Sequence, residues 1–199
     1  LQKLLIASGS LFLTGPERKL RILLTGGTLG IEFCRVAATR NFDLSKAELM
    51  FSDERFVALD HPDRNEAQAL KVWPGLEKAL FRFPGTSAPL GTAALEMDAQ
   101  LTAQLGSIDN NDDVFDLTVL GMGPDGHIAS LFPDHWAKGD WVVSEAHSPK
   151  PPSERLSLSY EALNRSARVW FLVSGEGKAN AVRIALESKE LPAGRVAGS

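Results

Sequence analysis

The 199-residue sequence has little of what builds a disulfide framework, a membrane span or a nucleic-acid surface. Its only cysteine, Cys34, cannot form an internal disulfide and joins no metal-binding cysteine cluster, which fits a reducing compartment. The longest apolar runs, such as Val169–Val173, are far shorter than the roughly 20 residues of a transmembrane helix. A net charge of −4 gives no overall field that attracts nucleic acid. We therefore expect a cytoplasmic protein with no membrane or nucleic-acid partner, in which any phosphate would meet a local basic pocket.

Common metal and nucleophile motifs are also missing. His135 and His147 have no metal-ligand spacing with His127, and no His-Glu-x-x-His or Cys/His cluster occurs. No Gly-x-Ser-x-Gly elbow is present, which disfavours a serine-nucleophile hydrolase. We expect no metal and no cofactor.

What is present is the composition of a globular protein, with 44% hydrophobic and 23% charged residues. The length suits one α/β domain rather than two. The chain begins at Leu1 without a methionine and ends abruptly at Ser199. The expectation is a single domain over residues 1–199, incomplete at one or both termini, that forms a monomer or a homodimer.

Strand-like and helix-like segments alternate along the chain, which predicts a parallel, doubly wound α/β sheet. The expected strands are 21–25, 48–52, 114–120, 141–144 and 169–174, and the expected helices are 31–38, 65–71, 93–105 and 176–187. Three strands end in residues suited to chemistry: Gly26-Gly27-Thr28, Asp53-Glu54-Arg55 and Gly121–His127. In open α/β sheets ligands bind beyond the carboxyl ends of the strands, so we expect these loops to share one rim.

The glycine-rich segment Gly121–His127 has two interpretations. In one it is a turn that ends in a surface histidine. In the other, amides near Gly123 and Gly126 face an anion, and His127 opens a helix through Ile128–Phe132. The positive end of that helix would keep His127 available as a base, and a hydrogen bond from Asp125 would fix the tautomer of its ring. The sequence leaves open whether Asp53 or Asp125 supports His127.

The basic and glycine-rich strand ends also have two interpretations each. Asp53-Glu54-Arg55 is either a solvated edge or a phosphate site, with Arg55 on the anion and Asp53 facing the reacting carbon or holding Arg55. Gly27 and Thr28 form either a tight turn or a phosphate cradle. Asn65 is expected to cap the following helix.

Taken alone, the side chains of Arg155 and Lys178 are expected to face solvent. Lys178 follows another strand end, where a basic residue can help to hold phosphate.

Read together, these segments resemble the 6-phosphogluconolactonase family. The resemblance runs from about Arg21 to Leu186 and is carried by Ser52–Val57, His61–Asn65, Leu120–Pro133, Ser148–Pro152, Arg155–Asn164 and Phe171–Lys178. It implies a sugar-phosphate-isomerase-like α/β/α sandwich that opens 6-phosphoglucono-1,5-lactone, with His127 as the base that activates water. The same resemblance makes Gly27, Thr28, Arg55, Arg155 and Lys178 the candidates for the phosphate pocket.

The chain departs from the family at a few positions. Many relatives have Gly-Gly-Ser-Thr-Pro where this chain has Gly26–Gly30, and Arg64 stands in place of a common serine. The alternative enzyme is a glucosamine-6-phosphate deaminase, which typically has tyrosine at the position of Arg55 and Ala-Phe-Asn-Glu-Pro at Ala129–Pro133. A non-catalytic sugar-phosphate-binding module is the second alternative.

Overall fold

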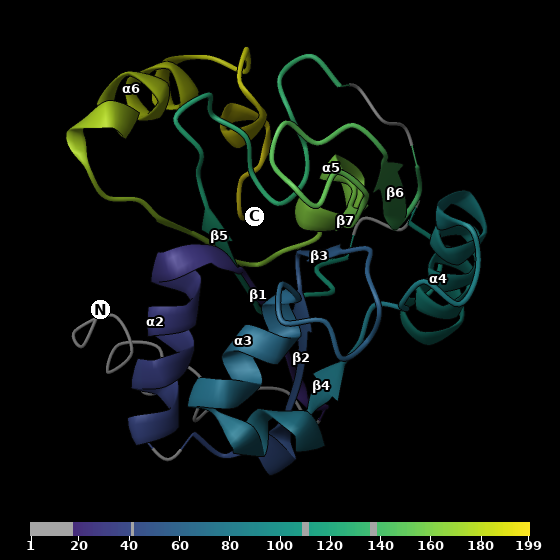
Figure 1. Cartoon of the computed structure of the whole chain (residues 1–199). Helices are drawn as coiled ribbons and strands as arrows, with labels where there is room; N and C mark the ends of the chain where they lie inside the picture. The colour runs from purple at the N-terminus through teal and green to yellow at the C-terminus, as the bar shows by residue number, and fades with distance from the viewer. Residues whose placement is uncertain (1–17, 41, 109–111, 136–138) are drawn as a thin grey trace.

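The computed structural model describes residues 18–40, 42–108, 112–135 and 139–199, which form a five-stranded sheet, a smaller three-stranded sheet and the helices around them (Figure 1). The strands are β1 (Leu20–Leu24), β2 (Ala47–Phe51), β3 (Asp53–Arg55), β4 (Leu80–Phe81), β5 (Leu117–Gly121), β6 (Val142–Glu145), β7 (Arg155–Leu158) and β8 (Val169–Leu172). The α-helices are α2 (Gly27–Thr39), α3 (Asn65–Val72), α4 (Leu90–Leu105), α5 (Tyr160–Leu163) and α6 (Ala179–Glu187). Short 3₁₀ turns are η1 (Leu44–Lys46), η2 (Pro74–Lys78), η3 (Glu176–Lys178) and η4 (Pro192–Arg195).

The larger sheet is parallel throughout, with the strand order β4-β2-β1-β5-β8. From β1 the chain adds β2 and β4 on one side, then returns to add β5 and β8 on the other. The order therefore reverses between β1 and β5. Such a switch point leaves a crevice at the carboxyl ends of the two strands, where α/β proteins bind ligands.

Alternate residues of the central strands pack into different cores on the two faces of this sheet. Ile22 and Leu24 of β1 belong to a buried cluster with Phe33 of α2. Leu23, between them, belongs to a second cluster that includes Met97 of α4. Because side chains along a strand point to opposite faces, the sheet is buried on both sides. The predicted three-layer α/β/α architecture with a mostly parallel sheet is confirmed, and Figure 1 shows α2 and α3 together on one side of it.

The smaller sheet was not predicted. Its order is β3-β7-β6, and both of its pairings are antiparallel. The sequence predicted a charged strand end at Asp53–Arg55 and no strand at Arg155–Leu158. The structure instead pairs these two segments, because the four residues of β7 are all buried and find their partners about 100 positions earlier in the chain.

Helix positions agree better with expectation. The prediction for residues 93–105 corresponds to α4, which starts three residues earlier, and the prediction for 176–187 corresponds to η3 followed by α6. Within the described part of the chain, no helix combines the length and the apolar character that a bilayer span requires.

Candidate active site

A cavity of about 530 Å³ opens at the carboxyl ends of the parallel strands. The start of helix α2, directly after β1, contributes Gly27 and Thr28, strand β3 contributes Asp53 and Arg55, and the loop after β5 contributes His127. The prediction that these three strand ends share one rim is therefore confirmed. A cavity of this volume is of the size that holds a small metabolite.

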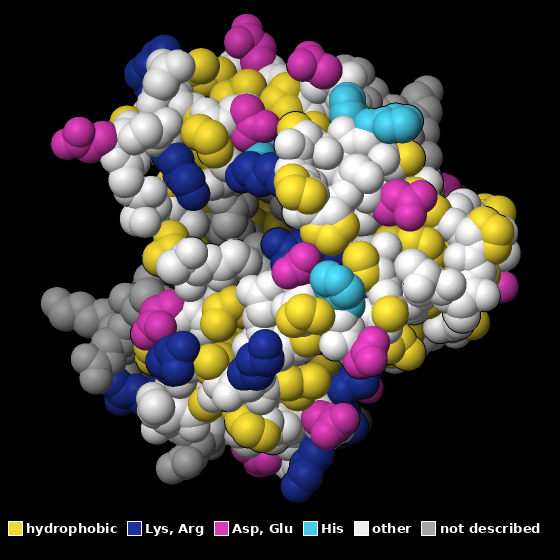
Figure 2. Space-filling view, viewed as in Figure 1, with side chains coloured by type: hydrophobic (Ala, Val, Ile, Leu, Met, Phe, Trp, Pro, Cys, Tyr) yellow, Lys and Arg dark blue, Asp and Glu magenta, His cyan; other side chains and the backbone are white. Residues whose placement is uncertain are grey.

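The walls of the cavity are rich in basic side chains. Among the described residues, the cavity is lined by Arg55, Lys150, Arg155 and Lys178 and by one carboxylate, that of Asp53. Figure 2 shows a hollow on this face of the molecule with Lys and Arg side chains beside it. In a protein with a net charge of −4, this is the local basic pocket that an anionic ligand requires. Lys150 was not among the predicted phosphate residues, although the Ser148–Pro152 segment carries part of the family resemblance.

Helix α2 directs its amino-terminal end into the cavity. Gly26, its N-cap, has no side chain to bond the first amides, and the first turn contains no acidic residue. Gly27 has φ +71°, a conformation that favours glycine, and a side chain at Gly30 would collide with the carbonyl of Thr25. The first N–H groups of a helix lack partners within it and carry partial positive charge, so this end can bind an anion.

Two arginines face each other across the small sheet. Arg55 of β3 and Arg155 of β7 are direct partners in the antiparallel register, and both line the cavity. Burial lowers the pKa of the Arg155 guanidinium, and the neighbouring charge of Arg55 adds to the effect, although Asp53 opposes it. Like charges placed opposite each other are destabilising unless an anion lies with them. This pair therefore points to a negatively charged ligand.

Arg155 also has a structural role. Its Nε donates to the carbonyl of Pro152 at 2.8 Å, and its Nη2 donates to the carbonyl of Lys150 at 3.0 Å. These bonds hold the 150–152 segment, which contributes Lys150 and Pro151 to the cavity wall.

His127 is supported by Asp125 rather than by Asp53, a choice that the sequence left open. The Oδ1 atom of Asp125 lies 2.6 Å from Nδ1 of His127. Burial by itself would raise the pKa of Asp125, but its hydrogen bond and attraction to the His127 ring outweigh burial and lower the pKa. His127 lines the cavity, whereas Asp125 does not. An ionised Asp125 keeps the proton on Nδ1 and leaves the Nε2 lone pair for the cavity.

Packing holds the same ring from another side. The rings of Phe132 and His127 lie 4.9 Å apart between centroids, at an interplanar angle of 39°. Phe132 is buried and also lines the cavity, so it limits how far the imidazole can turn.

The amides expected to face an anion from the glycine loop are already paired. The N–H of Gly123 donates to the carbonyl of His127 at 2.9 Å, and the N–H of Gly126 donates to the carbonyl of Gly123 at 3.1 Å. Both amides therefore shape the loop, and the expectation that amides around Gly123–Gly126 stabilise an oxyanion stays a prediction. Gly123 matters for space instead, since a Cβ there would lie 2.1 Å from Nδ1 of His127.

The prediction of a helix that starts at His127 is wrong. Residues Ile128–Leu131 form a tight turn closed by an Ile128–Leu131 bridge, with Ala129 at φ 47°. Tertiary hydrogen bonds account for the turn, because the buried Ser130 donates from Oγ to Oδ2 of Asp53 at 2.6 Å. The helix-dipole argument for His127 therefore does not apply.

The start of helix α3 is capped by Glu54 and not, as predicted, by Asn65. The Glu54 carboxylate accepts the backbone N–H of Asn65 at 2.7 Å and that of Glu66 at 3.0 Å. The Asn65 side chain donates instead to the carbonyl of Asp53 at 2.8 Å and lines the cavity. Across the described ranges, no group of three or more His, Cys, Asp or Glu side chains is placed to hold a metal ion.

Comparisons with known proteins agree with this geometry. The family profile described as glucosamine-6-phosphate isomerases/6-phosphogluconolactonase matches residues 13–199. A 6-phosphogluconolactonase of Mycobacterium leprae is 39% identical in an alignment 198 residues long that covers 92% of this chain and 79% of the relative. A probable 6-phosphogluconolactonase of Drosophila melanogaster is 34% identical over 83% of this chain and 68% of its own length. The crystal structure of the Thermotoga maritima 6-phosphogluconolactonase superposes with a TM-score of 0.84 at 28% identity, covering all of this chain and 88% of that one.

Proposed function

The chain belongs to the family of glucosamine-6-phosphate isomerases and 6-phosphogluconolactonases and is an enzyme of the 6-phosphogluconolactonase type, and from this premise we propose that it hydrolyses 6-phosphoglucono-1,5-lactone with His127 as the general base. The observation that carries the proposal is that His127, paired with Asp125, lines a cavity together with several basic side chains. The paired histidine supplies the base, and the cations supply the site for a phosphate.

The phosphate binds first in this mechanism. Arg55, Arg155, Lys178 and the first amides of α2 at Gly27 and Thr28 all line the cavity and are the groups that would hold the anion. Arginine forks and helix amino termini are the usual protein partners of phosphate oxygens. Anchoring the 6-phosphate there leaves the lactone carbonyl to be reached by His127.

The chemical step uses protein groups and water alone. Nε2 of His127 takes a proton from water as the water oxygen bonds to C1, and the tetrahedral intermediate then expels the ring oxygen. His127 returns the proton to that oxygen, so the products are one free carboxyl group and one hydroxyl group. General-base assistance of this kind contributes about 10²–10⁴-fold. Asp53 takes no proton in this scheme, and its carboxylate, held by Ser130, balances the charge of the Arg155 wall.

The test follows freshly generated 6-phosphoglucono-1,5-lactone by NMR with and without the protein, corrected for spontaneous hydrolysis. We expect faster conversion to 6-phosphogluconate by the wild type, and a loss of about 10²–10⁴-fold in kcat for His127→Gln. Full turnover by His127→Gln would refute the role of the histidine. Folded wild-type protein that leaves the lactone rate unchanged would refute the function, and ammonia release from glucosamine 6-phosphate would then identify the deaminase alternative.

A further inference from the structure

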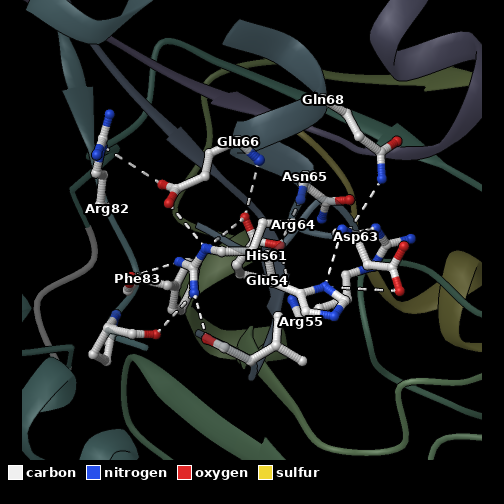
Figure 3. A network of polar contacts seen from close by, with 12 residues as sticks. Glu54, Arg55, His61, Asp63, Arg64, Asn65, Glu66, Gln68, Arg82 and Phe83 are labelled. Atoms are coloured by element: carbon white, nitrogen blue, oxygen red, sulfur yellow. Dashed lines mark hydrogen bonds and ion pairs between the residues drawn. The ribbon is translucent and has the colours of Figure 1, made fainter. Parts of the chain in front are cut away.

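A network of polar contacts that includes buried charged side chains lies around Arg55, which lines the cavity (Figure 3). Glu54, Arg64 and Glu66 are only 2%, 0% and 3% exposed. Nε of Arg64 donates to Oε1 of Glu66 at 2.9 Å and lies 3.9 Å from Oε2 of Glu54. Burying three charges is costly unless their hydrogen bonds are well satisfied. Their arrangement relative to the cavity explains what they do.

Arg64 ties together segments that are far apart in the sequence. Its Nη2 donates to the carbonyl of Phe83 at 2.7 Å, and its Nη1 lies 3.3 Å from the carbonyls of Val57 and Pro84. Residues 56–64 connect the end of β3 to the start of α3, so Arg64 closes this connection and fixes it to the 83–84 segment. Five rigid donors in one plane suit a guanidinium for this task better than an ammonium group.

Glu54 joins the strand to the helix. Besides capping α3, its Oε1 accepts the backbone N–H of Arg55 at 2.8 Å. Successive side chains of a strand point to opposite faces, so Glu54 turns into this network while its neighbours Asp53 and Arg55 turn to the cavity. Movement of Glu54 would therefore move both cavity residues.

Arg55 is held from the other end of the same connection. Its Nη1 donates to the carbonyl of Asp63, the residue that precedes Arg64. Its Nε is buried and has no hydrogen-bond partner among the described residues. The guanidinium is thus fixed at one corner and has an N–H that still needs an acceptor, such as a phosphate oxygen.

We propose that Arg64 is a positioning residue for the phosphate site, which acts with Glu54 to fix β3 and the Asp63 carbonyl and so aims Arg55 into the cavity. Arg64 does not line the cavity itself. The inference rests on the proposed function in taking the bound anion to be the 6-phosphate of the lactone.

The test compares Arg64→Met, Arg64→Lys and Arg183→Met in the lactonase assay. Arg183 pairs with Glu187 on the exposed surface of α6, so it is a matched control for loss of an arginine–glutamate pair. We expect Arg64→Met to raise KM about tenfold, as for one misplaced charge-assisted hydrogen bond, with kcat nearly unchanged. Arg64→Lys keeps the charge but cannot donate to all three carbonyls. Its KM should therefore fall between those of the wild type and Arg64→Met. Arg183→Met should match the wild type.

A purely structural role predicts a different pattern. Loss of folded protein lowers the apparent kcat and leaves KM unchanged, and that result would overturn the proposal. If Arg64→Met does not fold, Glu54→Gln tests the proposal in its place. We expect it to raise KM by the same factor as predicted for Arg64→Met. Calorimetric binding of inorganic phosphate gives a readout that needs no turnover: weaker binding by the variants supports the positioning role even if the wild type proves not to be a lactonase, and equal binding refutes it.

Discussion

Replacing Asp125 with asparagine separates the charge of the His127–Asp125 pair from its shape. The two side chains are nearly isosteric, and the amide oxygen of asparagine can still accept a hydrogen bond from the Nδ1–H group of His127. It cannot stabilise the positive charge that forms on the ring as His127 takes a proton from water. The variant therefore measures the electrostatic support that Asp125 gives to the transition state.

The structure sets the size of the effect. The 2.6 Å contact between Asp125 Oδ1 and His127 Nδ1 is a charge-assisted hydrogen bond once the ring is protonated, worth about 1.5–3 kcal/mol in typical cases. The Asp125 side chain is 42% exposed, so water screens part of this interaction, and about 1–2 kcal/mol is the appropriate range. This corresponds to a kcat lower by about 5- to 30-fold.

The assay is steady-state hydrolysis of the phosphorylated lactone at saturating substrate. Asp43→Asn makes the same chemical change at the exposed cap of η1, away from the cavity, and should leave kcat unchanged. Because Asp125 acts through His127, the double variant should be no slower than His127→Gln alone. The reasoning would be refuted if Asp125→Asn had the kcat of the wild type. It would also be refuted if Asp125→Asn lowered kcat by the same factor in His127→Gln as in the wild type.

Three further predictions concern the residues around this pair. Gly123→Ala would place a Cβ 2.1 Å from Nδ1 of His127 and should lower kcat by about 100-fold or more, whereas Gly91→Ala, with open space around it, should have no effect on turnover. Burial raises the pKa of Glu54 to about 7 from its ordinary value of 4.5, so its stabilising contribution is complete below pH 4.5 and is lost as the pH rises through 7. Urea unfolding of wild type and Glu54→Gln should therefore show a stability difference that falls as pH rises through this window, and a constant difference would contradict the assignment. Ser130→Ala removes the O–H that bonds a buried carboxylate and should lower the free energy of unfolding by about 1–3 kcal/mol, so an unchanged urea midpoint would show that this bond contributes nothing.

Local sequence was sufficient where one short segment carries its own signal. The runs that form β1 and β2 are apolar and end at residues with special conformational or charge properties, so both the strands and their functional ends could be predicted. Gly27 illustrates this, because a positive φ after a strand is a local requirement that glycine meets. The general placement of ligands at the ends of parallel strands then brought His127 and Arg55 into one predicted rim.

Contacts between distant segments decided the rest. A helix after His127 was compatible with its own residues, but the hydrogen bond from Ser130 to Asp53, 77 positions earlier, favours a turn. The cap of α3 comes from Glu54, on a strand 11 residues before Asn65, and no local capping pattern reveals it.

By itself, then, the sequence determined the α/β class, the glycine turns and the candidate residues at the strand ends, because backbone preference and apolar spacing act within a few residues. Only the tertiary structure decided that Asp125 supports His127, that Arg55 faces Arg155, and that Arg64 closes the connection behind them. These arrangements depend on hydrogen-bond partners and burial that exist only once the chain is folded, when a buried polar group must find a partner wherever the fold brings one.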